Sequence, residues 1–424
     1  MQNVDKTLTA DWSLKDYLKA IGPAVVIAAL VIGPGSVTTL SAMGSQYSYL
    51  PLWIIIAACC CSFIYQEPAI RIAGTKGVGV LDAIRIKYGT TVATVLWAMM
   101  LLGTLAFQAG NFMGAAMAMN YFIPSISLQG WTAIMILMGL AIALASKYNI
   151  VEGFIKWLVL IMVVGFVFTA FSSGPGVGQL MSEGFSFTIP GGNWFLVLAL
   201  ISTTMVPDIP VALSALIKGR YFGDHGSEKD RATPEVLRLR LCRIDLSVGL
   251  IVTGMISIAV LVCSASVLFP QGIVVKSAAD MAKQLEPFLG RYAGVLFSLG
   301  LWAAAVSSGL FRMQLVPMLF NQAQDLPDTL ANNRSRILIL IAGLIPLCFV
   351  LLWGRSPVEL IITAQAVNGL LLPILAGTMW KLSTDKEFLG EHVNGPVRNV
   401  LMGIVFFLTL SLATRTFLSI TGLL

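Results

Sequence analysis

Long apolar segments separated by short polar turns recur along almost the whole chain. A helix needs roughly 20 residues to cross about 30 Å of hydrocarbon, and each segment is close to that length or longer. Eleven segments are predicted to span a membrane: residues 19–42, 49–72, 90–121, 130–147, 150–172, 194–217, 244–269, 290–320, 335–353, 358–380 and 397–421. This pattern predicts an all-α, multi-pass protein embedded in a lipid bilayer.

The composition supports this prediction and leaves little room for other classes. Hydrophobic residues make up 57% of the 424 residues and charged residues 11%, against roughly 25% charged in soluble domains. The polar residues 1–18 contain no hydrophobic signal core with a cleavage site, so we expect a cytoplasmic N-terminal segment before one transmembrane domain, residues 19–424. No nucleophile, cofactor or catalytic motif is present, and neither an enzyme nor a bound cofactor is predicted.

Basic residues in the polar turns predict the orientation. Residues 218–243 carry seven Lys and Arg, whereas residues 173–193 carry none. The positive-inside rule then places the N-terminus in the cytoplasm and the C-terminus outside it. The net charge of +6 reflects this topology, and we do not expect nucleic-acid binding.

Cysteine and histidine offer no metal site within the apolar segments. Three cysteines run consecutively at residues 59–61, and the other three stand alone without paired ligand spacing. The two histidines, His225 and His392, fall in polar turns. A histidine proton relay inside the membrane is therefore not expected.

The first apolar segment is interrupted by Gly33, Pro34 and Gly35 in LVIGPGSVTTL. Proline cannot donate a backbone hydrogen bond, and glycine adopts backbone angles that side chains forbid. We predict that one half-helix ends here and that a second begins, facing residues 206–208 across a polar cavity. The N–H groups after Gly35 would lie at the start of the second half-helix, where an anionic group can bind.

The sixth segment is interrupted in the same way. Pro207 and Pro210 flank Asp208 in LALISTTMVPDIPVALSALI. Paired breaks in the two halves of a chain are the best sequence indication of a transporter site, because half-helix ends deliver unpaired backbone groups to the midplane.

The order of several motifs resembles the Nramp divalent-metal transporters over nearly the whole chain. They are IGPAVVIAALVIGPGSVTTLSAMGSQYSYLPLWI from residue 21, Trp97 with NFMGAA at 111–116, VP and LSALI at 206–217, RID at 243–245 and SS at 307–308. The resemblance implies a LeuT-type fold with a 5+5 inverted repeat, residues 19–172 and 194–380, plus an extra helix at 397–421. Helices 1 and 6 would be unwound around the substrate.

The ligand positions depart from the family pattern. Where Nramp proteins have Asp-Pro-Gly-Asn, this chain has Gly33 and Ser36 at the Asp and Asn positions. The Met-Pro-His of helix 6 becomes Val206, Pro207 and Asp208, so the thioether that favours manganese and iron is absent.

The proton-carrying positions depart as well. Acidic positions of the third helix align with Leu101, Gln108 and Asn111, and the second histidine of helix 6 aligns with Leu213. These groups do not titrate near neutral pH, so proton coupling by the family's route is not expected. Gln108 and Asn111 either line a hydrated path or simply pack between helices.

Asp208 is the main ionisable candidate inside the membrane. A charge there requires a partner or water, so Asp208 is either a substrate ligand or half of a structural ion pair with Arg312. Arg243 and Asp245 are predicted to lie at a helix start, in a capping or interfacial ion pair.

Three functions remain open from the sequence: a transporter of a hard divalent cation such as Mg²⁺, a transporter of a small carboxylate-bearing solute such as an amino acid, and a non-transporting sensor. The second is supported by IGPGS, which resembles the glycine-rich first helix of amino acid-polyamine-organocation transporters. The predicted substrate-binding residues are Gly33, Pro34, Gly35, Ser36, Val206, Pro207, Asp208 and Asn368, with Ser36 and Asp208 as metal ligands and Gln108, Asn111, Gln365 and Arg312 along the pathway.

Overall fold

All regular elements of the computed structural model are helical. The structure describes residues 33–145, 148–223, 227–327, 329 and 332–421. Within these ranges, nine helices are long and apolar enough to cross a membrane. A tenth is obtained if a pair bent by 109°, Trp157–Ser172 with Val177–Gly184, counts as one span.

The long helices follow the predicted segments closely. In the first half they are α4 (Pro34–Tyr47), α5 (Leu52–Lys76), α7 (Thr90–Phe122), α8 (Leu128–Ala145) and α9 (Tyr148–Ser172). In the second half they are α11 (Trp194–Thr204), α12 (Ile209–Tyr221), α14 (Glu235–Val267), α17 (Ala293–Gln324), α18 (Asn333–Leu352), α19 (Pro357–Gly369), α20 (Leu372–Ser383) and α22 (Pro396–Thr421). Residues 19–32, the beginning of the first predicted segment, lie outside the described residues.

Short helices connect the long ones. The α-helical connections are α6 (Val80–Tyr88), α10 (Val177–Gly184), α13 (Glu228–Arg231), α15 (Ala278–Lys283), α16 (Glu286–Leu289) and α21 (Lys386–Leu389). Three single 3-10 turns complete them: Pro190–Gly192, Gly290–Tyr292 and Gly390–His392.

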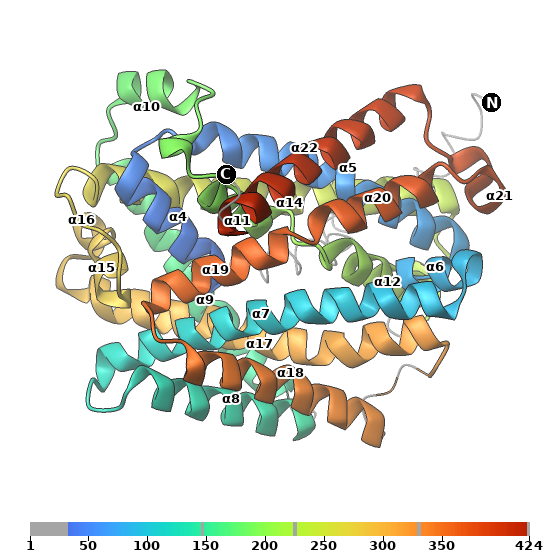
Figure 1. Cartoon of the computed structure of the whole chain (residues 1–424), viewed down its shortest axis with the longest axis horizontal. Coiled ribbons are helices and arrows are strands. Elements are labelled where there is room, and N and C mark those ends of the chain that lie inside the picture. Colours follow the sequence, from blue (N-terminus) through green and yellow to red (C-terminus); the bar gives the residue numbers. More distant parts are fainter. Residues whose placement is uncertain (1–32, 146–147, 224–226, 328, 330–331, 422–424) are drawn as a thin grey trace.

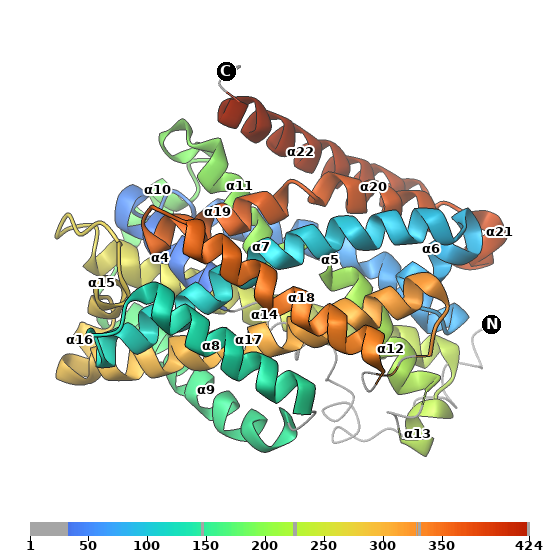
Figure 2. The same ribbon diagram turned by 60° about the horizontal axis from the view of Figure 1, so that its bottom comes forward.

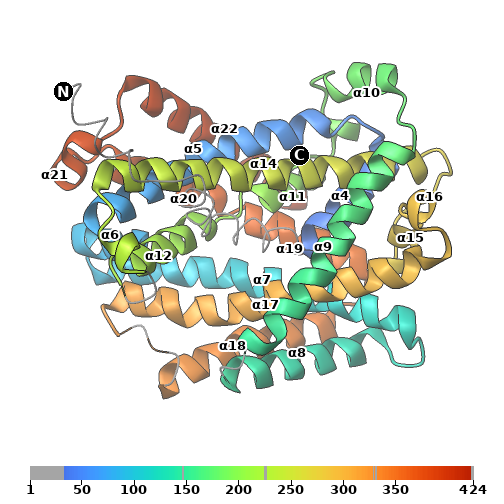
Figure 3. The same cartoon turned by 180° about the vertical axis from the view of Figure 1, so that it is seen from behind.

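The long helices pack roughly along one common direction. In Figure 1, α7 and α17 lie side by side, with α8 and α18 below them and α5, α20 and α22 above. The turned view separates α22 from the rest of the bundle at its C-terminal end (Figure 2). Seen from behind, α9 crosses the bundle obliquely, over α17 (Figure 3).

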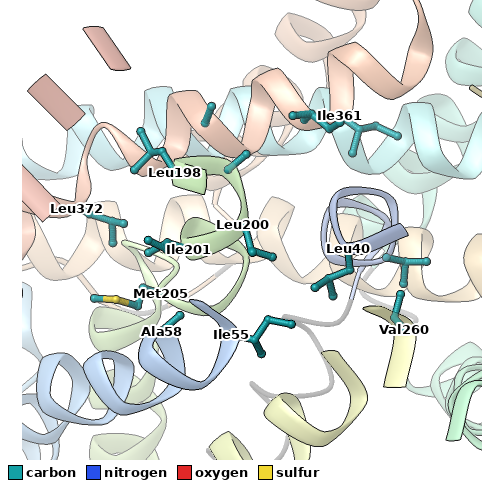
Figure 4. Close-up of a cluster of buried hydrophobic side chains, with 14 of the residues drawn as sticks. Leu40, Ile55, Ala58, Leu198, Leu200, Ile201, Met205, Val260, Ile361 and Leu372 are labelled. Carbon is teal, nitrogen blue, oxygen red and sulfur yellow. The ribbon is translucent and has the colours of Figure 1, made fainter. Parts of the chain in front are cut away.

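A hydrophobic core holds the half-helices in place. It joins Leu40 of α4, Ile55 of α5, Leu200 of α11, Val260 of α14 and Ile361 of α19, each at most 1% exposed (Figure 4). Because α4 and α11 are too short to be stable alone, this packing is what positions their ends.

Close contact between α4 and α14 fixes the first half-helix further. A Cβ added to Gly44 would lie 2.7 Å from the carbonyl oxygen of Leu261, so only glycine allows this approach. One turn away, the Ser264 hydroxyl donates to the Ser41 carbonyl at 2.6 Å. Small residues at such an interface let helix backbones pack closely.

One of the long segments is broken and another is irregular. The break in the sixth segment is confirmed, since residues 205–208 separate α11 from α12. The tenth segment remains one span, Pro357–Ser383, as predicted, with an irregular turn between α19 and α20. Leu370 and Leu371 keep right-handed helical backbone angles there, and Pro373, which has no N–H to donate, accounts for the irregularity.

The placement of Arg243 at a helix start was wrong. Helix α14 begins at Glu235, because a helix can continue beyond the hydrocarbon, where charged side chains are solvated and hydropathy no longer marks its end. Arg243 therefore lies two turns inside α14, and its Nη2 is 2.9 Å from Glu67 Oε1 of α5. The ion pair expected for it exists, but its partner lies in another helix.

Candidate functional site

Helix α4 begins within the Gly-Pro-Gly sequence. Gly33 is its extended N-cap residue, with φ −107° and ψ −171°, and Pro34 is its first residue. Proline fits there because the first N–H groups of a helix have no intrahelical acceptor. The first helical hydrogen bond runs from the Val37 N–H to the Gly33 carbonyl at 3.2 Å, so the N–H groups of Gly35 and Ser36 precede it.

Side chains of α5 hold the break between α11 and α12. The Tyr65 hydroxyl donates to the Pro207 carbonyl at 2.8 Å, and the Ser62 hydroxyl donates to the Thr204 carbonyl at 3.2 Å. Tyr65 and Ser62 are both fully buried. Two carbonyls freed by the break are thereby satisfied inside the bundle, as an interrupted membrane helix requires.

Asp208 and Arg312 form a buried ion pair. Arg312 Nη1 donates to Asp208 Oδ2, and the two residues are 4% and 3% exposed. The guanidinium carbon also lies 3.8 Å from the centre of the Phe107 ring. The ion pair considered from the sequence is therefore present, while Asp208 Oδ1 has no hydrogen-bond partner among the described residues.

Polar side chains join α7 to α17 about one helical turn from the Asp208–Arg312 ion pair. Gln108 Nε2 donates to the Gly309 carbonyl at 2.9 Å, and Asn111 Nδ2 donates to Ser308 Oγ at 3.2 Å. These contacts are interhelical packing bonds. Ser308 and Arg312 stand four residues apart on α17, which separates the ion pair from these hydrogen bonds by about 6 Å along the helix axis.

The start of α4 lies beside the hydrogen bonds that join α7 to α17 and also beside α19. A Cβ added to Gly33 would lie 3.6 Å from both Asn111 Oδ1 and Ser308 Oγ. A Cβ added to Gly35 would lie 1.7 Å from Gln365 Nε2. The fold thus places two of the predicted pathway residues, Asn111 and Gln365, beside the Gly-Pro-Gly sequence.

Several oxygen atoms in this region lack hydrogen-bond partners within the described residues. They are Asn111 Oδ1 and Gln365 Oε1, whose side chains lie beside Gly33 and Gly35, and Asp208 Oδ1 of the ion pair. Buried polar atoms are rarely left unpaired, so oxygens of this kind indicate a place for water or an ion. Their chemistry is that of ligands for a hard cation.

The other predicted site residues are placed less uniformly. Ser36 is buried at 4% exposure beside this region, one residue from Gly35. Asn368 lies one turn beyond Gln365 on α19, and its Oδ1 is 2.5 Å from a Cβ added to Gly103. Val206 packs instead in an apolar cluster with Phe107, so its side chain offers no ligand.

Two residues that shape the site were not singled out from the sequence. They are Tyr65, which supports the break, and Phe107, whose ring lies against the Arg312 guanidinium. Ser308, which accepts from Asn111, belongs to the SS motif noted in the sequence. Nothing in the sequence distinguishes Tyr65 and Phe107 from other aromatic residues of membrane helices, because their partners lie on other helices. No group of three or more His, Cys, Asp or Glu able to hold a metal occurs in the described part of the chain.

Comparison with known proteins assigns the family. The family model described as natural resistance-associated macrophage protein-like matches residues 24–419. The chain belongs to the Nramp family. It is accordingly an integral multi-pass membrane protein of a transporter family and not an enzyme.

Relatives cover the Nramp chain almost end to end. The divalent metal cation transporter MntH of Caldanaerobacter subterraneus subsp. tengcongensis is 24% identical over 94% of this chain and 92% of its own. A mutant of the Eremococcus coleocola manganese transporter has a TM-score of 0.78 at 18% identity, over 97% of this chain and 88% of its own.

A more distant solved structure extends the fold relationship. The nucleobase-cation-symport-1 transporter Mhp1 has a TM-score of 0.56 at 11% identity, over 94% of this chain and 92% of its own. Together with the broken helices, these likenesses give this Nramp protein a LeuT-type fold, as the sequence resemblance implied.

Proposed function

We propose that this Nramp protein is a secondary transporter of a divalent cation, with a hard cation such as Mg²⁺ preferred over Mn²⁺ and Fe²⁺. The observation that carries the proposal is the set of buried oxygens on Asn111, Asp208 and Gln365 that find no hydrogen-bond partner in the described part of the chain. All of these are oxygen ligands, the kind that Mg²⁺ and Ca²⁺ take, and the thioether position is Val206.

Charge favours a cation that keeps much of its hydration. Asp208 is the carboxylate of the site, and Arg312 already compensates its charge through Oδ2. The free Oδ1 can bind a cation directly while Arg312 stays in place. Mg²⁺ suits such a site, because it retains several waters and is often held by one or two carboxylates. Ser36 would add a hydroxyl ligand, and Asn368 would complete the polar lining.

The relatives support a cation over an organic solute. The relatives described above are a divalent metal cation transporter and a manganese transporter, and the family match covers the site on all its helices. A carboxylate-bearing solute would have to bind at the start of α4, where the unpaired atoms of Asn111 and Gln365 among the described residues are oxygens, which accept hydrogen bonds and cannot donate them to a carboxylate. A sensor without transport would show binding but no flux.

Flux into liposomes tests the proposal. Purified protein should carry Mg²⁺ into vesicles loaded with a fluorescent Mg²⁺ indicator, and Asp208→Asn should abolish that flux. Glu359→Gln is the matched control, since it removes an exposed carboxylate at the start of α19. Equal flux in the wild type and Asp208→Asn would refute the role of Asp208, and flux of an amino acid but not of any cation would refute the substrate class.

Mn²⁺ is expected to bind weakly or not at all. The site lacks the family's first-helix acid and amide and its thioether, so no set of four to six good Mn²⁺ ligands remains. Gly33→Asp with Val206→Met should create Mn²⁺ affinity in calorimetry, with Gly33→Asp alone as the intermediate case. Micromolar Mn²⁺ binding to the unmodified protein would contradict this expectation.

Substrate flux is also expected to proceed without proton flux by the family's route. Gln108 and Asn111 replace acids, and both are tied into bonds between α7 and α17. A pH indicator inside the liposomes should therefore record no substrate-dependent acidification. A clear proton signal that Asp208→Asn removes would show instead that Asp208 carries the proton.

A further inference from the structure

Two adjoining hollows lie on the bundle away from the candidate site. The first, of about 280 Å³, lies between α5, α14 and α22 and is lined by Glu67, Arg71, Arg243 and Arg398 together with apolar residues. The second, of about 400 Å³, lies between α5 and α14 and is almost entirely apolar. Phe63 lines both, so the two hollows adjoin at this side chain; together they are called the groove, with a charged end and an apolar end. Figure 3 shows α5 and α14 side by side, with α22 next to them.

The charged end is built around a buried ion network. Arg71 Nε is 2.7 Å from Glu67 Oε2, and Arg71 Nη1 and Nη2 donate at 2.5 Å to the His392 carbonyl and to Asn394 Oδ1. Arg243 shares the other carboxylate oxygen of Glu67. Arg71 is 1% exposed, so this network is part of the folded interior and fixes the position of the hollow.

Among the residues that line this end, positive charge exceeds negative charge. Glu67 supplies one negative charge, whereas Arg71, Arg243 and Arg398 supply three positive ones. Among the described residues Arg398 has no ion pair, and the Arg243 side chain remains 34% exposed. A hollow with an excess of two positive charges and fork-shaped guanidinium donors is suited to a phosphate group.

The apolar end has the direction and length of a lipid tail. Helices α5 and α14 run antiparallel, since Glu67 contacts Arg243 and a Cβ on Gly254 would lie 3.1 Å from Cys59 Sγ. The apolar hollow extends along α14 from Ser247 to Ile258, which is about 16 Å at 1.5 Å per residue. That distance is about half of the 30 Å hydrocarbon thickness, or one leaflet.

We propose that this groove binds an anionic phospholipid. Its phosphate lies between Arg243 and Arg398, which lies in the first turn of α22, and one acyl chain extends past Phe63 along α5 and α14. Basic pockets between membrane helices recognise anionic head groups in this way. The lipid joins α22 to the bundle, and its binding does not depend on which substrate the transporter carries.

Thermal unfolding of the full chain in non-ionic detergent, titrated with phosphatidylglycerol, tests the proposal. A ligand that binds only the folded state raises the melting temperature. Phosphatidylglycerol is expected to raise it at lower concentrations than phosphatidylcholine with the same chains, and inorganic phosphate is expected to leave it unchanged. Arg398→Gln should weaken the apparent affinity for phosphatidylglycerol about fivefold, equivalent to about 1 kcal/mol per basic residue near an anionic surface.

Matched variants separate this site from a general effect of charge or bulk. Arg415→Gln removes an arginine from the far end of α22, beside Trp194, and should not change the affinity. Ile251→Trp should fill the apolar end and weaken binding, whereas Ile404→Trp, at a similarly exposed position outside both hollows, should not.

Three results would overturn the proposal. Equal stabilisation by phosphatidylcholine would show that the site does not distinguish an anionic head group from a zwitterionic one. An equal loss of affinity for phosphatidylglycerol in Arg415→Gln and Arg398→Gln would show that positive charge acts non-specifically. Stabilisation by inorganic phosphate as strong as that by the lipid would identify a free-anion site in place of a lipid site.

Discussion

Arg312→Met is expected to lower the free energy of unfolding by about 3–5 kcal/mol, because it leaves the Asp208 carboxylate buried without its counter-charge. Equilibrium unfolding in detergent micelles measures this loss. Mg²⁺ should then stabilise Arg312→Met more than the wild type, since a bound cation would replace the missing positive charge beside Asp208.

The double variant Asp208→Leu with Arg312→Met is the control. Removing both members of a buried ion pair is often neutral for stability, so this variant should recover most of the loss while failing to respond to Mg²⁺. If Arg312→Met costs less than about 1 kcal/mol, the pair is hydrated and not the buried interaction described above.

Gly35→Ala is expected to reduce transport at least about tenfold, equivalent to about 1.4 kcal/mol, while the protein still folds. The added methyl group would coincide with the Gln365 amide and force that side chain out of the site, which a flexible side chain can do at little cost to folding. Gly33→Ala should also reduce transport, but by filling space in the site. Its methyl group would touch Asn111 Oδ1 and Ser308 Oγ, where a ligand or water would lie.

Gly178→Ala provides the matched control for both glycine variants. Gly178 lies in α10, and a Cβ there meets nothing within 4 Å. Flux assays and melting temperatures should show all three variants folded and only Gly178→Ala transporting at the wild-type rate. Transport at the wild-type rate by Gly35→Ala would show that the Gly-Pro-Gly sequence only shapes a helix end.

Hydropathy was sufficient to predict most helices, since a membrane segment must be both apolar and long. It located α7 and α22 to within two residues. It could not find the start of α14, because residues 235–243 are helical and charged at once. It also could not find the irregular turn of the tenth segment, because Leu370 and Leu371 are as apolar as their neighbours.

The small number of ionisable residues in the apolar segments was enough to predict part of the site. So few ionisable residues lie in the apolar segments that Arg312 was an evident partner for Asp208, and the structure pairs them. Uncharged contacts carry no such signal. The hydrogen bond from Tyr65 to the Pro207 carbonyl and the ring of Phe107 beneath Arg312 depend on the relative positions of helices far apart in the sequence.

The central claim is that Asp208 and the oxygens around it bind a hard divalent cation. The most direct test is the melting temperature of the purified wild type and of Asp208→Asn across a panel of Mg²⁺, Ca²⁺, Mn²⁺, amino acids and organic acids. We predict that Mg²⁺ raises the melting temperature of the wild type, that Mn²⁺ does so no better, and that Asp208→Asn loses the response. A rise with an amino or organic acid and with no divalent cation, or an undiminished Mg²⁺ response in Asp208→Asn, would contradict the claim.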